Sequence, residues 1–274
     1  MSMTVTHTPP APPVPRARPN LKVPLQSLGF FLLGLGLLTL VYVLLSALRS
    51  DLPKLAEIGS ALGTLLKDPW YNRGPNDQGI LNLLLSSLKR VFSGFALGAL
   101  VAIPLGVVMG SVPGVRRALD PVVQLLRPVS PLAWFPIGLV LFKSAEPATV
   151  FIIFITALWP TVINTAFGVS GVPQDFKNVA RVFQFTPTQY VLRVLMPYAL
   201  PHIVTGLRIS FGIAWMVIVA AEMLSGKSGI GFFVWDAWNA LNLPNVVSAI
   251  LIIGVTGFIF DRLFNVLEKK VSYV

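Results

Sequence analysis

VFSGFALGALVAIPLGVVMGS, residues 91–111, is a run of 21 residues without a charged side chain. A helix needs about 20 mostly apolar residues to cross a lipid bilayer. The run therefore predicts a membrane-spanning helix, and the apolar residues 81–88 before it are a candidate entry into the same span. Pro104 lies inside the run and is compatible with a span, because neighbouring helices can satisfy the backbone carbonyl that a proline frees.

Similar apolar runs lie on both sides of this one. They predict five further spans, at residues 28–48, 120–142, 150–169, 203–224 and 246–267. The first resembles a secretory signal because basic residues precede it, but it exceeds the usual 7–15 apolar residues and no cleavage pattern follows. We therefore interpret residues 28–48 as an uncleaved anchor.

The span at residues 120–142 differs from the others in its proline content, with prolines at positions 121, 128, 131 and 136. Proline removes a backbone donor and clashes with the preceding helical turn. We therefore expect this span to be an interrupted helix.

The composition of the whole chain agrees with a membrane protein. Of its 274 residues 54% are hydrophobic and 12% are charged, whereas a soluble domain carries about 25% charged residues. The predicted fold class is therefore an all-α, polytopic membrane protein with about six spans. The chain has no cysteine and only two histidines, His7 and His202, which argues against a disulfide framework or a cysteine- or histidine-based metal site.

The net charge of +10 does not form a dense basic face, because the Lys and Arg residues lie in the gaps between apolar runs. This distribution indicates topology control and no nucleic-acid partner. A cytoplasmic N-terminus would place 13 Lys and Arg residues in the inner segments and six in the outer ones. The positive-inside rule then predicts that both termini are cytoplasmic.

Two domains are expected. Residues 1–24 are rich in proline and predict a disordered cytoplasmic tail, and residues 25–274 form the transmembrane domain. Within that domain, four glycines of the run at 91–111 are spaced for close helix packing, namely Gly94, Gly98, Gly106 and Gly110. Packing within one chain and a seam between two chains are both compatible with this spacing.

The segment 173–201 is a long polar interruption with a helical pattern of its own. Four apolar residues share one face of a short helix, namely Phe176, Val179, Ala180 and Phe183. Polar residues occupy the other faces, among them Asp175, Asn178, Arg181 and Gln184. Such a helix suits either the groove of a partner protein or the lipid surface.

A second helix is predicted directly after the first. Thr186 and Gln189 have the spacing of a capping box, and Pro187 occupies the first helical position. We expect this helix to run to Met196 and to be ended by Pro197 and Pro201.

The same segment resembles the cytoplasmic signature loop of bacterial ATP-binding-cassette importer permeases, whose pattern is Glu-Ala-Ala, three residues, Gly, nine residues, Ile-x-Leu-Pro. Here Asn178-Val179-Ala180 stands at the first position and Gln184 at the glycine. Nine residues follow before Val194-Leu195-Met196-Pro197. The spacing is intact, while the glutamate and the glycine are replaced.

Further motifs resemble one branch of that family, the branch for nitrate, bicarbonate, cyanate and sulfonates. They are Ala214-Trp215, Ala221-Glu222-Met223-Leu224 and the run from Gly229 to Asn239. The resemblance implies a type I importer permease in the bacterial inner membrane that carries a small oxyanion, with nitrate first and bicarbonate, cyanate or sulfonate as alternatives. A self-sufficient secondary carrier or channel is the competing class.

The resemblance also implies partners. These are two cytoplasmic ATPase subunits, an extracytoplasmic solute-binding protein and a second permease copy, which most simply forms a homodimer. The coupling loop, residues 173–198, would contact the ATPases through Asp175, Phe176, Asn178, Val179, Ala180, Arg181, Phe183 and Gln184. No cofactor and no catalytic residue are expected.

Gly226-Lys227-Ser228 imitates the end of a phosphate-binding loop. That motif needs a glycine five residues before its second glycine, and Ala221 occupies the place. We therefore expect no ATPase in this chain.

Six residues are candidates for the transport pathway or its gate. Glu222, near a span end, is interpreted as a gate or as a structural ion pair, for example with Lys227. Arg208 either reaches the membrane surface or attracts an anion. Trp215 and Met216 either pack or line the pore. Ser130 and Trp134 lie in the interrupted span, where a helix N-terminus could face an anion.

Overall fold

The computed structural model describes residues 22–74 and 77–271. The chain divides into two compact units, residues 1–54 and 55–274, and each is described by itself. The first contains α1 (Lys22–Leu48), which covers the predicted anchor. The Tyr42 hydroxyl donates a hydrogen bond of 2.8 Å to the Pro53 carbonyl. Most of the predicted tail, residues 1–21, lies outside the described residues.

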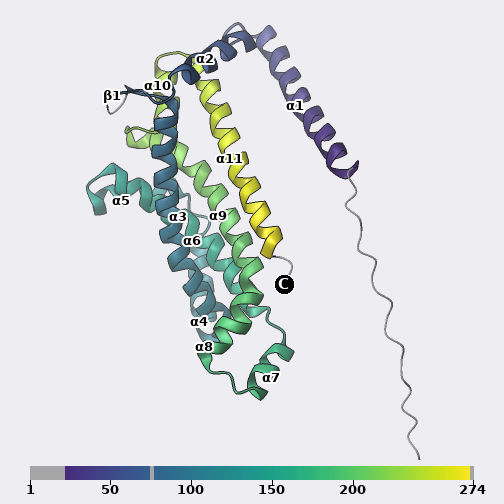
Figure 1. Cartoon of the computed structure of the whole chain (residues 1–274). Helices are drawn as coiled ribbons and strands as arrows, with labels where there is room; N and C mark the ends of the chain where they lie inside the picture. Colours follow the sequence, from purple (N-terminus) through teal and green to yellow (C-terminus); the bar gives the residue numbers. More distant parts are fainter. Residues whose placement is uncertain (1–21, 75–76, 272–274) are drawn as a thin grey trace, which may run out of the picture. The chain divides into compact units, whose positions relative to one another are not determined.

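The second unit is built on four long helices that lie side by side (Figure 1). They are α3 (Ile80–Ser111), α6 (Ala145–Ser170), α9 (Met196–Ser225) and α11 (Leu243–Val271). Each covers one predicted span, and α3 begins at Ile80 because the apolar residues before Val91 continue the same helix. Among the described residues, five helices could cross a membrane by length and composition, or six with a bent pair counted as one span.

That bent pair is the third predicted span. It consists of α4 (Pro113–Leu126), followed by the 3₁₀ turn η1 (Pro131–Trp134) and α5 (Phe135–Phe142). The two arms are bent by 94°. The predicted interruption is therefore confirmed, and it falls where Pro128 and Pro131 follow one another closely.

Short elements cover the two ends of the bundle. At one end lie α2 (Leu55–Lys67), the hairpin of β1 (Asn72–Gly74) and β2 (Asp77–Gln78), and α10 (Ile230–Asn239). At the other end lie α7 (Gln174–Val182) and α8 (Pro187–Tyr190) (Figure 1). We call these the α10 end and the α7 end.

The four glycines of α3 form a seam against α6. A Cβ atom at any of them would lie within 3.0 Å of an α6 residue. The nearest α6 residues are Ile153 for Gly94, Ala157 for Gly98, Thr165 for Gly106 and Val169 for Gly110. The partner number rises with the glycine number, so the two helices run parallel. Packing within the chain is thus confirmed for these glycines.

Candidate functional site

The helix α7, together with Phe183 directly after it, leaves most of its apolar side chains exposed. Phe176, Val179 and Phe183 are exposed by 51%, 52% and 70%, whereas Ala180 is buried. The predicted apolar face therefore divides, because Ala180 packs against the bundle while the three larger residues stay largely exposed. Phe176 keeps one ring contact with Tyr198 of α9, with 6.2 Å between the ring centroids. Such exposed apolar side chains are typical of a surface that a partner covers.

The polar residues predicted for coupling surround this apolar surface. Asp175, Asn178 and Arg181 are all exposed. Gln184 is the second residue after the helix and has a left-handed conformation, with φ of 50°. This is the position at which the signature loop has glycine, and glycine adopts positive φ most readily. The backbone turn of the signature is therefore present although its glycine is replaced.

The capping box of the second helix is present as predicted. The Thr186 hydroxyl accepts from the Gln189 backbone N–H, and the Gln189 side chain accepts from the Thr186 N–H. The predicted end of this helix is wrong. A π-helical turn, Val191–Leu195, joins α8 to α9 without a break, so Pro197 lies in the first turn of α9 and Pro201 inside it. In a continuous helix a proline leaves a carbonyl of the preceding turn without its N–H donor, and the wider π-helical turn lies in the turn before Pro197.

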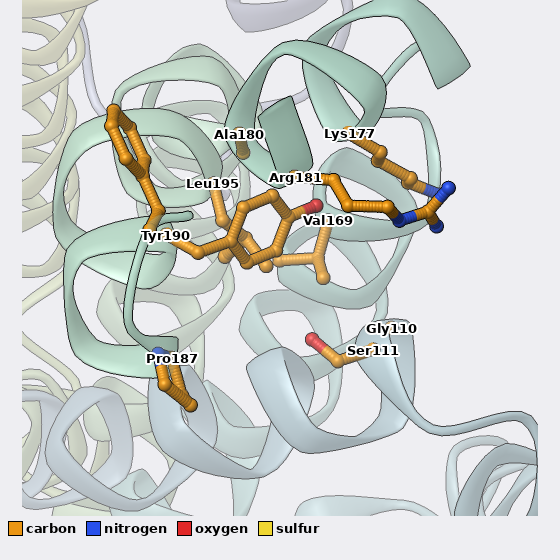
Figure 2. A pocket seen from close by; sticks show the side chains of 10 residues that line it. Gly110, Ser111, Val169, Lys177, Ala180, Arg181, Pro187, Tyr190 and Leu195 are labelled. Atoms are coloured by element: carbon orange, nitrogen blue, oxygen red, sulfur yellow. The ribbon is translucent and has the colours of Figure 1, made fainter. Parts of the chain in front are cut away.

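A cavity of about 480 Å³ lies between the coupling segment and the bundle at the α7 end. Figure 2 shows Lys177 and Arg181 extending from α7 to the same side, while Tyr190 reaches in from α8. Gly110 and Ser111, at the end of α3, form part of the opposite wall. The coupling segment is therefore separated from α3 by open space.

Glu222 is the centre of a buried polar cluster toward the α10 end. It is 1% exposed and lies 2.8 Å from the guanidinium of Arg90, which is 9% exposed. The same carboxylate accepts hydrogen bonds from the Ser87 hydroxyl at 2.8 Å and from the Gly231 N–H at 2.9 Å. The predicted ion pair exists, but its partner is Arg90 and not Lys227.

This cluster fixes the start of α10. Arg90 also donates to the Ser228 carbonyl, and Ser87 accepts from the Ile230 N–H. Gly229 has φ of 150°, and a side chain there would collide with the Glu222 carboxylate. The cluster therefore joins α3, α9 and α10, and α10 is an element that the sequence did not predict.

Arg208 is paired as well. It contacts Asp261 at 2.9 Å and Glu268 at 2.8 Å, both on α11, and Thr205 donates to the second oxygen of Glu268. Two carboxylates thus compensate its charge, so the expectation of a cation free to attract an anion is not supported here.

The remaining candidates are dispersed. Trp215 is 5% exposed and donates to the Ile253 carbonyl at 3.1 Å, which is a packing role, while Met216 is 74% exposed. Ser130 is exposed directly before η1. The indole nitrogen of Trp134 is buried and is one of two side-chain polar atoms without a hydrogen-bond partner in the described part of the chain.

The structure brings forward one residue that sequence reasoning treated only as a topological charge. Arg127, which follows α4 at the bend, lines a second cavity of about 250 Å³. The other walls come from the middle of α6, including Trp159 and Pro160, and from Ile209 and Ile213 of α9. Its sequence signal is a basic residue beside the prolines that interrupt a span.

Comparison with known proteins agrees with this architecture. Residues 102–273 match the family model described as "Binding-protein-dependent transport system inner membrane component". The "Nitrate import permease protein NrtB" of Synechocystis sp. is 43% identical over 235 residues, 86% of each chain. The "Bicarbonate transport system permease protein CmpB" of the same organism is 45% identical over 210 residues, 76% of this chain and 75% of that protein.

A solved structure supports the fold independently. A chain of the MetNI methionine ABC transporter in inward-facing conformations superposes with a TM-score of 0.62 and covers 70% of this chain and 95% of its own. Its sequence identity of 16% makes this a likeness of fold alone.

Proposed function

The chain belongs to the family of binding-protein-dependent transport system inner membrane components, and from this premise we propose that it forms the translocation pathway of an ATP-driven importer for a small oxyanion, with nitrate as the leading substrate. The observation that carries the proposal is the exposed apolar surface of α7 on a chain of this family. Bicarbonate is the alternative substrate, because the bicarbonate permease is about as similar in sequence to this chain as the nitrate permease is. Nitrate leads because the match to the nitrate permease extends over 86% of both chains.

In the proposed assembly, the two ends of the helix bundle contact different partners. The α7 end faces the cytoplasm, where Phe176, Val179 and Phe183 enter grooves on two ATPase subunits. The α10 end receives an extracytoplasmic solute-binding protein, and a second copy of the chain completes the pathway. The N-terminus is cytoplasmic, residues 25–274 form the permease domain, and residues 173–198 form its coupling loop.

ATP hydrolysis is proposed to reside entirely in the partners. Gly226 ends α9 with φ of 62°, and the three residues after it lead directly into α10. This is a short connection between two helices and supports no phosphate-binding loop here. Closure of the ATPases around ATP switches the pathway only if it favours the outward-facing state over the inward-facing one.

The test of the coupling surface is the substitution Val179→Asp. A charge on this half-exposed apolar residue is expected to lower the amount of ATPase that co-purifies by about tenfold or more, as for the loss of an interface hot spot. The measurement is the ratio of ATPase to tagged chain after extraction from native membranes. Leu241→Asp is the matched control, because Leu241 is 84% exposed at the other end and has φ of 56°, a conformation that aspartate tolerates.

Equal ATPase recovery with Val179→Asp and the wild-type chain would show that α7 is not the docking element. The substrate is tested separately, by reconstituting the wild-type chain with its ATPase and binding protein and measuring ATP-dependent uptake of nitrate and of bicarbonate. Uptake without any ATPase would instead favour the secondary carrier.

A further inference from the structure

The cavity beside Arg127 lies at the mid-depth of the bundle. Trp159 and Pro160 are near the middle of α6, and Ile209 and Ile213 are near the middle of α9. Both helices are long and apolar enough to cross a membrane. The cavity, of about 250 Å³, therefore lies close to the centre of the bilayer and has room for a small anion with part of its hydration shell.

Arg127 brings an uncompensated positive charge to this cavity. Among the described residues that line it, none is acidic. Ion pairs engage Arg90, Arg116 and Arg208, and Arg127 forms none with the described residues that line its cavity. Arg127 is exposed in the single chain. A charged side chain at mid-membrane depth is costly and commonly marks an ion or substrate pathway, so an exposed arginine without a carboxylate partner at this depth points to such a pathway.

Two other polar side chains of the cavity already use a donor within their own helix. The Thr156 hydroxyl donates to the Ile152 carbonyl at 2.7 Å, and the Asn164 amide donates to the Pro160 carbonyl at 2.8 Å. Both bonds lie within α6. Arg127, with five N–H donors in a planar fork, is the only charged donor among the lining residues that the structure describes.

We propose that Arg127 is the anion-binding residue of a transmembrane substrate site and that this site selects monovalent oxyanions. The proposal rests on the proposed oxyanion transport and names the residue that carries it. One guanidinium neutralises one negative charge, so a planar monoanion such as nitrate or bicarbonate leaves the cavity neutral. A site with a single charged contact binds weakly, which suits a site from which the ion must also leave.

The test uses the full complex of chain, ATPase and binding protein in proteoliposomes, with nitrate and bicarbonate as separate probes. The measured quantity is the number of anions imported per ATP hydrolysed at saturating substrate. Arg127→Gln is expected to lower this ratio at least tenfold, and Arg127→Lys, which keeps the charge, to stay within threefold of the wild-type value. Arg117→Gln removes an exposed charge from α4, the helix that Arg127 follows, and is expected to leave the ratio unchanged.

A second variant keeps the proposal testable if Arg127→Gln fails to assemble. Ile213→Trp fills the cavity from α9 without altering a charge and is expected to lower the same ratio at least tenfold. If either variant imports as many anions per ATP as the wild-type complex does, the proposal for Arg127 is overturned, while the proposed oxyanion transport stands. If the wild-type complex hydrolyses ATP but imports neither anion, the proposed function itself has failed, and Arg127 has no such role.

Discussion

Glu222→Ala is expected to destabilise the folded chain by about 3–5 kcal/mol, the usual effect of removing one partner of a buried ion pair. The substitution leaves the guanidinium of Arg90 buried without its counter-charge. It also removes the acceptor of the Ser87 hydroxyl and of the Gly231 N–H. The measurement is the midpoint of thermal unfolding of the detergent-solubilised chain, followed by loss of the monodisperse size-exclusion peak.

Two controls separate the pair from a general sensitivity of this region. Lys227→Ala alters an exposed residue nearby and is expected to change stability by less than about 0.5 kcal/mol. The double variant Arg90→Met/Glu222→Leu removes both charges and is expected to recover part of the loss, since it leaves no unpaired buried charge but still leaves the Gly231 N–H without its acceptor. A midpoint for Glu222→Ala equal to that of Lys227→Ala would contradict the assigned structural role.

The spans could be predicted from the sequence because the signal is local. A bilayer demands a minimum length of apolar residues wherever a helix crosses it, and each long helix satisfies that demand within its own segment. The interruption near Pro128 and Pro131 was predictable for the same reason. The continuation of the helix through Pro197 was not predictable, because a proline ends a helix or is accommodated within it depending on whether the preceding turn widens.

The pairing of charges could not be predicted, because it depends on tertiary contacts. Glu222 has Lys227 five residues away in the sequence, yet it pairs with Arg90, 132 residues away. Arg208 has the sign needed for an anion site, but Asp261 and Glu268 of another helix compensate it. Arg127 has no such partner among the described residues. The sequence shows which residues are charged, but tertiary packing determines which of those charges have a partner of opposite sign.

The coupling segment lies between these two cases. Its spacing and its capping box follow from residues close together in the chain, so both were predictable. The division of its apolar face was not, because α7 shares that face between the bundle, through Ala180, and the surface. The same division supports the proposed docking role, since Phe176, Val179 and Phe183 are not buried in the chain's own core.

Gly106→Leu is expected to destabilise the chain by about 3 kcal/mol or more, at or above the upper end of typical overpacking costs. A Cβ atom at Gly106 would lie 2.6 Å from the Cβ of Thr165 and 2.8 Å from the Val162 carbonyl oxygen. The carbonyl belongs to the backbone of α6, so the two helices must separate to admit a side chain. The higher helix propensity of leucine recovers only about 1 kcal/mol.

The matched control is Gly254→Leu on α11, where a Cβ atom would meet nothing within 4 Å. That variant is expected to be as stable as the wild type or more stable, because it gains helix propensity without a collision. Both variants are compared by thermal unfolding of the solubilised chain, so that partners do not contribute. Equal midpoints would show that α3 and α6 can part at no cost. A lower midpoint for Gly106→Leu alone would establish that the parallel α3 and α6 helices are a rigid pair, against which α9 and its paired Glu222 are held.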